Sequence, residues 1–305
     1  WISDYSGIEE LYYRKYDYLF EAWSAIARVS NNSNEIFQKQ DFIVDNNDNL
    51  HFVWSQGEEN SQKILFRTIW NNETKGVIEE VTYGINKAID PAIIIDENNR
   101  LNIFWSNHTS EIPTDVYGTK FINTASKSIY SSIWSNYLEV APFIPQERPP
   151  SSRSDASNPA ITLDKAGYLW LAYEIQEDYA YHKGIDIRYR TSSGWQISEK
   201  ISLINNLAKN PQLLVDNDNF MYAFWLDSRS ANYQLFYRVR NDNYNWYNEI
   251  QITTSPSHSR SNWIFIGAFI GGVILLMIPY VIYKYLRRRR ERNLIKNKIS
   301  FLKEG

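Results

Sequence analysis

The chain of 305 residues contains no cysteine, and this absence removes several kinds of chemistry. Thiol nucleophiles, cysteine-ligated zinc, iron–sulfur clusters and a disulfide framework are all excluded. Histidine is scarce, because the chain has only four, at positions 51, 108, 182 and 258, and they form no paired ligand motif. The 12 glycines and 10 prolines are too few for a collagen-like or low-complexity chain.

Positive charge is also scarce over most of the chain. Residues 1–262 contain 23 basic and 33 acidic side chains, whereas residues 284–305 contain nine Lys and Arg and two acidic residues. The acidic body argues against a nucleic-acid partner. Aromatic residues are abundant at 15%, and large flat side chains at that density suit β structure with much buried area.

One long apolar run lies near the C-terminus, from Trp263 to Tyr285, and its only charge is Lys284. A helix of this length is about 34 Å long and can cross a bilayer core of about 30 Å. We therefore expect a single transmembrane helix over 263–285, preceded by a short stalk over 255–262. A basic run follows the helix, at Arg287, Arg288, Arg289 and Arg290.

Positive charge stays on the cytoplasmic side of a membrane, so this run predicts a cytoplasmic tail over 286–305 and an extracellular N-terminal domain. The tail is expected to lie on anionic lipid headgroups. The chain opens WISDYSGIEE, without Met or an apolar leader. Together with the repeats described next, this opening predicts that the natural protein extends further at its N-terminus and is exported by a signal peptide.

Four segments of the body align without gaps. They are DFIVDNNDNLHFVW (41–54), PAIIIDENNRLNIFW (91–105), PAITLDKAGYLWLAY (159–173) and PQLLVDNDNFMYAFW (211–225). Each consists of an apolar run, a polar turn and an aromatic run, which is typical of a β-hairpin. A third strand is expected at 64–67, 116–121, 185–190 and 235–240, and a fourth at 76–81, 134–140, 195–201 and 246–252.

Four strands per unit of about 50 residues predict an all-β fold, a β-propeller of four-stranded blades occupying residues 1–254. The nearly continuous apolar runs suit strands buried on both faces, whereas a two-sheet sandwich would show cleaner alternation. Two more predicted strands, at 11–16 and 23–29, precede the four whole units and match the third and fourth strands of a unit. Trp1 matches the position of Trp54, at the end of a second strand. About five blades are therefore visible, the first lacking its front half.

The repeated P-x-I-x-x-D-x-x-x-x-L-x-x-x-W/Y hairpins and the stretch FWLDSRSANYQLFYR (224–238) resemble the sialidase-like, BNR-type β-propellers. The resemblance covers about residues 1–254 and implies a propeller that acts on or binds carbohydrate. No arginine triad and no Tyr/Glu nucleophile pair of that family is identifiable from motifs.

Loops that join second to third strands share one face of a propeller with the loops between blades. Here those loops carry acidic and aromatic residues, which glycan binding or glycoside hydrolysis would use. The candidate catalytic residues are Glu174, Glu177, Asp178, Asp227 and Arg229. The candidate ligand-binding residues are Glu58, Glu111, Tyr179, Tyr181 and His182. Solvated loops, and an Asp227–Arg229 pair that braces its loop, are the alternatives.

The turns between first and second strands place oxygen-bearing side chains at alternate positions, as Ca²⁺ loops do. Asp45, Asp96 and Asp216 are the candidate ligands, but Asn and Asp also favour such turns for backbone reasons. We expect turns rather than metal sites, and no cofactor. Asn31, Asn72 and Asn107 begin N-glycosylation sequons.

The sequence thus predicts a single-pass cell-surface protein whose extracellular propeller binds a glycan or a protein. A membrane-anchored glycoside hydrolase of sialidase-like type is the second hypothesis, and a structural or adhesion role is the third.

Overall fold

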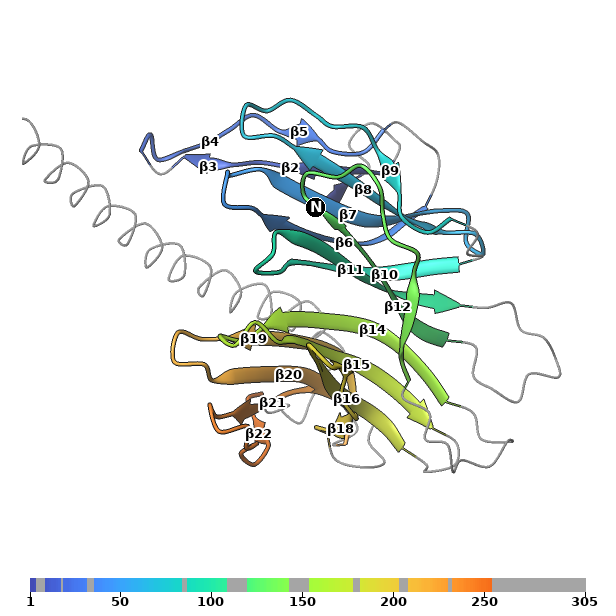
Figure 1. Ribbon diagram of the computed structural model, residues 1–305, viewed down its shortest axis with the longest axis vertical. Helices are drawn as coiled ribbons and strands as arrows, with labels where there is room; N and C mark the ends of the chain where they lie inside the picture. Colours follow the sequence, from blue (N-terminus) through green and yellow to red (C-terminus); the bar gives the residue numbers. More distant parts are fainter. Residues whose placement is uncertain are drawn as a thin grey trace, which may run out of the picture. The chain divides into compact units, whose positions relative to one another are not determined.

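The computed structural model describes residues 1–3, 9–17, 19–31, 36–83, 87–108, 120–142, 154–177, 182–202, 208–229 and 232–253. All of them belong to a compact unit of residues Trp1–Thr254 (Figure 1), and Ser255–Gly305 form a second unit. The regular structure of the described residues is entirely β. These residues contain no helix that is long and apolar enough to cross a membrane. The predicted stalk, membrane segment and tail lie outside the described residues.

The strands form a series of antiparallel sheets in chain order, which we number I to V. Sheet I contains β1 (Ile2–Ser3), β2 (Glu10–Tyr13) and β5 (Ala27–Arg28), and a small ribbon joins β3 (Tyr16–Asp17) to β4 (Ala22–Trp23). Sheet II contains β6 (Ile36–Val44), β7 (Leu50–Gly57), β8 (Lys63–Ile69) and β9 (Glu79–Glu80). Sheet III contains β10 (Lys87–Ile95), β11 (Arg100–His108), β12 (Lys120–Ser128) and β13 (Leu138–Ala141).

Sheets IV and V repeat the same order of strands. Sheet IV contains β14 (Ser154–Leu163), β15 (Leu169–Glu177), β16 (His182–Thr191), and both β17 (Gly194–Trp195) and β18 (Glu199–Lys200), which pair with β16. Sheet V contains β19 (Ala208–Val215), β20 (Met221–Asp227), β21 (Gln234–Arg240) and β22 (Ile250–Gln251). In sheet I, the Tyr12 N–H donates to the Trp1 carbonyl, so Trp1 lies opposite Tyr12 as Trp54 lies opposite Leu65.

The four predicted hairpins are present, but the third strand of sheet III extends seven residues beyond the predicted range, of which 116–119 lie outside the described residues. The prediction was 116–121, whereas β12 is Lys120–Ser128. The reason is composition, because β12 reads KFINTASKS and buries Asn123, Thr124 and Lys127 beside its few apolar side chains. Hydrophobic pattern alone therefore favoured the apolar residues that come before it.

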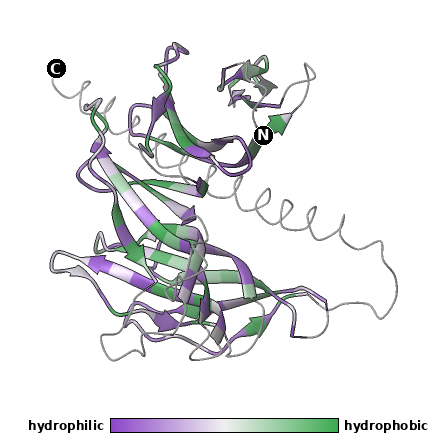
Figure 2. Ribbon diagram, turned by 90° about the vertical axis from the view of Figure 1, so that its right-hand side faces the viewer, coloured by the Kyte–Doolittle hydropathy of each residue, from purple (hydrophilic) through white to green (hydrophobic). Residues whose placement is uncertain are grey.

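The core lies between consecutive sheets rather than inside any one of them. Four clusters of buried side chains join sheets I and II, II and III, III and IV, and IV and V. Ile93 packs toward sheet II and its neighbour Ile94 toward sheet IV, so both faces of β10 are covered. This explains the continuous apolar runs in the sequence, and Figure 2 shows the hydrophobic residues along these strands.

An aspartate organises the turn between the first two strands of sheets II to V. In sheet IV, Asp164 Oδ1 accepts the backbone N–H groups of Ala166 and Tyr168 at 2.9 Å each, and Oδ2 accepts Trp170 Nε1–H at 2.9 Å. Equivalent backbone bonds are made by Asp45, Asp96 and Asp216. The fourth turn residue has positive φ in every case, at Asp48, Asn99, Gly167 and Asn219, which Asn, Asp and Gly tolerate best.

We call the contact between two consecutive sheets a seam. In each of sheets II to V, a cationic side chain reaches across the seam to the preceding sheet and fixes the two sheets against each other. In sheet IV, Arg188 donates through Nη1 to the Val140 carbonyl of sheet III at 2.5 Å and through Nε to Gln196 O at 3.0 Å, and stacks on Trp195. Arg67 and Arg238 cross to the carbonyls of Val29 and Ile201 in the same way.

The seam between sheets II and III uses a different cation. Sheet III has Ala125 where the repeat places arginine, and Lys127 bridges to Glu79 of sheet II at 2.5 Å. The ammonium group lies 4.4 Å from the Phe66 ring and 4.7 Å from the Trp134 ring. Burial lowers the pKa of Lys127, and Glu79 acts against that shift.

The seam bridges can be tested on the full chain with Arg188→Ala. The substitution leaves the buried carbonyl of Val140 without its charged donor, so we expect a loss of about 3 kcal/mol in the free energy of unfolding. Arg190→Ala removes an exposed arginine from the same strand and is the matched control. Thermal and urea denaturation measure both variants, and equal stability of the two would contradict a bridging role for Arg188.

Candidate functional site

The first strands of sheets III, IV and V each contain a bulge at an Asx–Pro pair. The ladder with the second strand shifts register at Asp90-Pro91, Asn158-Pro159 and Asn210-Pro211. The residue before proline has φ of +54° in all three, a conformation that Asn and Asp tolerate, and proline has no N–H to lose from the ladder. Sheet II shows the same shift, between Phe37 and Gln40, with Lys39 at the equivalent position.

These bulges bring polar side chains of several sheets together, in what we call the bulge cluster. Its members come from the first or second strands of sheets II to V, and are Lys39, Asp90, Ser106, Asn158, Glu174 and Asn210.

Asn158 is the centre of the bulge cluster. Its Oδ1 accepts from Lys39 Nζ at 2.6 Å, and its Nδ2 donates to both Glu174 Oε1 and Asn210 Oδ1 at 2.7 Å. Lys39 comes from sheet II, Asn158 from sheet IV and Asn210 from sheet V. Side chains of three sheets therefore meet within hydrogen-bond distance.

In sheets III and IV, the residue that follows the last aromatic residue of the repeat segment accepts a hydrogen bond from the bulge residue of the next sheet. Ser106 Oγ of sheet III accepts the Asn158 N–H of sheet IV at 2.8 Å. In the same position of sheet IV, Glu174 Oε1 accepts the Asn210 N–H of sheet V at 2.8 Å. Ser106 also donates to Asp90 Oδ2 at 3.3 Å. Each bulge cluster side chain is thus oriented by at least one neighbour.

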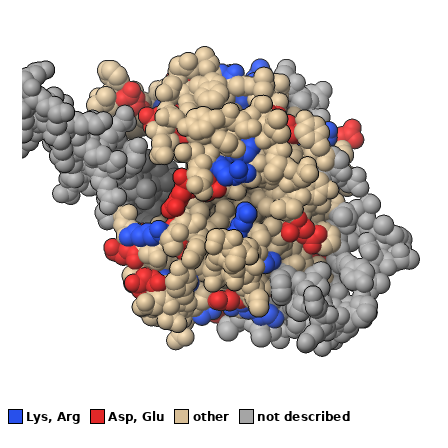
Figure 3. All heavy atoms as spheres, in the orientation of Figure 1, with Lys and Arg blue, Asp and Glu red and all other residues tan. Residues whose placement is uncertain are grey.

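The bulge cluster combines two carboxylates with one ammonium group, two amides and a hydroxyl group. Asp90, Asn158, Glu174 and Lys39 are partly exposed, and Asn210 is exposed, so the polar groups are within reach of solvent. Near this end of sheet III, burial and the charges of Lys120 and Lys87 lower the pKa of His108 to about 4. His108 is therefore neutral at neutral pH. On the face seen in Figure 3, acidic and basic side chains are interspersed.

Two of the sequence-predicted catalytic residues form a structural brace. Asp227 is fully buried, and Arg229 contacts it at 2.6 Å while also contacting Glu249 at 2.5 Å. Burial opposes the charge of Arg229, but hydrogen bonds to these two carboxylates raise its pKa. The guanidinium also lies 4.1 Å from the Phe236 ring, so Arg229 is held against sheet V by two carboxylates and an aromatic ring.

The other predicted site residues divide into four groups. Glu174 belongs to the bulge cluster, and Glu58 lies in an exposed turn whose carbonyl accepts the Ser61 N–H. Glu177 and His182 are backbone partners at the ends of β15 and β16. The remaining candidates, Glu111, Asp178, Tyr179 and Tyr181, lie outside the described residues.

The predicted metal positions lie in the turns between first and second strands, and of the predicted glycosylation positions Asn107 directly follows Ser106 of the bulge cluster on β11. Asp45, Asp96 and Asp216 each serve their own turn, and among the described residues no group of three or more His, Asp or Glu side chains could hold a metal ion. Asn31 and Asn72 are exposed, whereas Asn107 is partly buried on β11. The Asn72 Oδ1 atom accepts from the Thr74 hydroxyl at 2.7 Å within its own turn.

Sequence reasoning missed most of the bulge cluster. Lys39, Asp90, Ser106, Asn158 and Asn210 were not predicted, because the acidic and aromatic residues of the long loops give a stronger sequence signal than polar residues inside strands. A signal was present, since three of the four aligned repeats have Asp or Asn immediately before the shared proline. An Asx–Pro pair inside a strand marks a bulge, and bulges re-aim side chains.

No family model and no curated protein sequence matches the chain. Solved structures do resemble it. An α-L-arabinofuranosidase of Fusarium graminearum, in complex with arabinobiose, has a TM-score of 0.52 at 13% identity, covering 72% of this chain and 67% of that one. An α-L-arabinanase of Penicillium chrysogenum has a TM-score of 0.53 at 13% identity, with the same coverage.

A variant of the NanB sialidase of Streptococcus pneumoniae has a TM-score of 0.54 at 9% identity. The match covers 73% of this chain and 53% of the sialidase, so the chain spans about half of the length of that enzyme. These enzymes are β-propeller glycoside hydrolases, and at such low identity the likeness concerns the fold alone. The described part of the chain therefore has a sialidase-like, propeller-type all-β fold.

Proposed function

We propose that the protein is a carbohydrate-binding β-propeller whose ligand binds at the bulge cluster. The observation that carries this proposal is the meeting of side chains from different sheets at Asn158. A site assembled from several elements on a rigid framework holds its polar groups in fixed directions, which favours selective binding.

The chemistry of the bulge cluster suits a sugar. Carboxylate oxygens of Asp90 and Glu174 accept hydroxyl protons, the amides of Asn158 and Asn210 both donate and accept, and Lys39 donates. The charges nearly balance within the bulge cluster, so a neutral polyhydroxylated ligand fits better than a highly charged one. Many hydroxyl groups in fixed positions can replace the hydrogen bonds that these side chains make with water.

Hydrolysis of a glycosidic bond is the second candidate function. It is favoured by the two carboxylates of the bulge cluster and by the fold that the chain shares with glycoside hydrolases. In that case Glu174 would be the general acid, and Asp90 would be the second catalytic carboxylate. Binding is preferred because Glu174 Oε1 already accepts hydrogen bonds from Asn158 Nδ2 and from the Asn210 N–H, so this carboxylate is engaged in holding the bulge cluster together.

The larger architecture follows from the same repeat. We propose that sheets I to V are five propeller blades, and that sheet I represents the back part of its blade. Residues 263–285 are proposed to anchor this ectodomain to a membrane, with the sequence as the support. The basic tail over 286–305 then lies in the cytoplasm against anionic lipid, and the propeller binds its glycan or protein partner outside the cell.

The proposed site is tested by measuring binding of the full chain to a glycan array, with Asn158→Ala and Glu174→Gln. Asn158→Ala removes the centre of the bulge cluster, and we expect glycan binding to weaken about tenfold or more. Asn243→Ala, in an exposed turn of sheet V, is the matched control and keeps wild-type binding. Glycan binding that is unchanged by Asn158→Ala would contradict the site.

The same variants separate binding from hydrolysis, with nitrophenyl arabinofuranoside and a fluorogenic sialoside as substrates. We expect no turnover by the wild-type chain. Turnover that Glu174→Gln abolishes while glycan binding persists would replace the binding proposal with the hydrolase.

The anchor is tested by labelling from outside the cell with a membrane-impermeant reagent. A tag placed before Trp1 is expected to react in intact cells, whereas a tag placed after Gly305 is expected to react only after the membrane is opened. The reverse pattern, or release of the chain as a soluble protein, would contradict the proposed topology.

A further inference from the structure

A cleft of about 370 Å³ lies at the seam between sheets II and III, at the opposite end of the strands from the bulge cluster. It is formed by the turns after β6 and β8 of sheet II and by the turn after β12 of sheet III. Its volume falls in the range of small-molecule binding sites. None of the residues predicted from the sequence for glycan binding or catalysis lines it.

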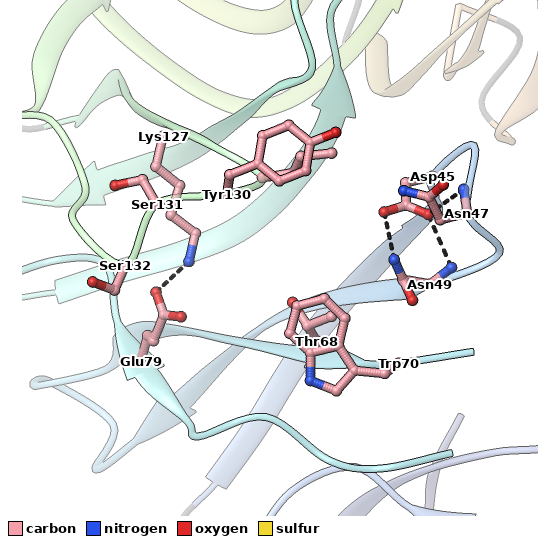
Figure 4. Close-up of a pocket in the computed structure, with 11 residues that line it drawn as sticks. Asp45, Asn47, Asn49, Thr68, Trp70, Glu79, Lys127, Tyr130, Ser131 and Ser132 are labelled. Atoms are coloured by element: carbon pink, nitrogen blue, oxygen red, sulfur yellow. Dashed lines mark hydrogen bonds and ion pairs between the residues drawn. The ribbon is translucent and has the colours of Figure 1, made fainter. Parts of the chain in front are cut away.

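Two exposed aromatic side chains belong to this seam cleft. Trp70 is 41% exposed and Tyr130 is 80% exposed, although both are large rings that a folded protein usually covers. In the view of Figure 4 the two rings lie on two sides of the cleft, with the Asp45–Asn49 turn and the Lys127–Glu79 pair on the others. Exposed aromatic faces beside polar groups are typical of ligand sites rather than of a core.

The charged groups of the seam cleft are already satisfied. Lys127 is paired with Glu79, and Asp45 accepts hydrogen bonds from its own turn and lies 3.2 Å from His51 Nε2. Burial lowers the pKa of His51, with Asp45 acting the other way, which favours a neutral ring at neutral pH. A strongly charged ligand would thus find no free counter-charge among these groups.

Groups that suit a neutral ligand remain on the rim of the seam cleft. Asn47 is exposed in its turn and Ser132 is exposed after Tyr130, whereas the Ser131 hydroxyl already hydrogen-bonds the backbone of Ile133. An amide and a hydroxyl group can donate to and accept from the hydroxyls of a sugar, while the faces of Trp70 and Tyr130 cover its apolar C–H surface.

The seam between sheets IV and V is filled by other side chains than the seam between sheets II and III. Between sheets IV and V, Arg240 takes the place of Lys127 and lies 3.7 Å from the Trp170 ring and 4.4 Å from the Tyr244 ring. It also lies 3.7 Å from Asp164 and is 1% exposed, so the stacked side chains occupy that seam. Between sheets II and III, His51 replaces the larger Trp170, and the shorter Lys127 turns to Glu79.

We propose that the seam cleft is a second, separate carbohydrate site that takes a neutral sugar between Trp70 and Tyr130. The proposal does not depend on the function proposed for the bulge cluster, because the two sites share no residue. Two sites at opposite ends of one propeller would allow the protein to hold two sugar units at once, which raises avidity for a branched or polymeric glycan.

The test uses saturation-transfer NMR on the full chain with methyl glycosides of glucose, galactose and mannose as probes. We expect transfer to at least one of them, and a loss of about tenfold in affinity in Trp70→Ala and in Tyr130→Ala. Trp23→Ala and Tyr247→Ala, which remove exposed rings of other sheets, are matched controls and keep wild-type binding. Asn158→Ala leaves the Trp70-dependent signal unchanged, which separates this site from the bulge cluster.

Three results would overturn the proposal. The first is no transfer to any neutral glycoside, and the second is transfer that Trp70→Ala and Tyr130→Ala leave unchanged. The third uses tetramethylammonium as a probe, because aromatic rings beside carboxylates can also hold a cation. Binding of that cation, with no binding of the glycosides, would replace the sugar with a cationic ligand.

Discussion

A cation that reaches from one sheet into the outer strand of the preceding sheet sets the geometry on which the rest of this structure depends. Apolar faces attract each other without direction, so packing alone would leave the sheets free to slide or rotate. Arg67, Arg188 and Arg238 each donate to a backbone carbonyl across the seam and to another in their own sheet. The guanidinium of Arg188 is buried and those of Arg67 and Arg238 are half-buried, so loss of these partners is costly. The bridge therefore fixes each sheet at one angle to its neighbour.

With the sheets held in place, the bulges of their first strands converge. The backbone conformation of the bulge is the same in three sheets, since Asp90, Asn158 and Asn210 each have a φ of +54° before a proline. The side chains differ from sheet to sheet, and Lys39 stands at the same position in sheet II. Repetition thus provides the framework, while variation at one position of the repeat provides the chemistry of a site. The seam between sheets II and III follows the same rule, because sheet III has Ala125 in place of the bridging arginine and Lys127 in place of Arg240 of sheet V, and the seam cleft lies beside Lys127.

Much of this fold could be predicted from the sequence because its signals are local. The four hairpins follow from the apolar run, the polar turn and the aromatic run, and the turn aspartates follow from the backbone preferences of Asp and Asn. The full extent of β12 could not be predicted, because buried Asn123, Thr124 and Lys127 give it a polar pattern. Glu174 was predicted from its position after a second strand, but its partners Lys39 and Asn210 were not. Lys39 and Asn210 both contact Asn158, from which they are 119 and 52 positions away in the sequence. No local sequence pattern encodes contacts between residues so far apart.

The most direct test of this account uses the absence of cysteine from the chain. The double variant Lys39→Cys with Asn158→Cys places two thiols at positions whose native side chains contact each other between sheets II and IV. A short bismaleimide reagent then cross-links two thiols that lie within its reach. The convergent bulges predict efficient cross-linking within one chain. Val44→Cys with Asn158→Cys, in which the first thiol lies at the other end of β6, is expected to cross-link poorly. Equal yields for the two pairs, or none for Lys39→Cys with Asn158→Cys, would contradict the convergence of the first strands.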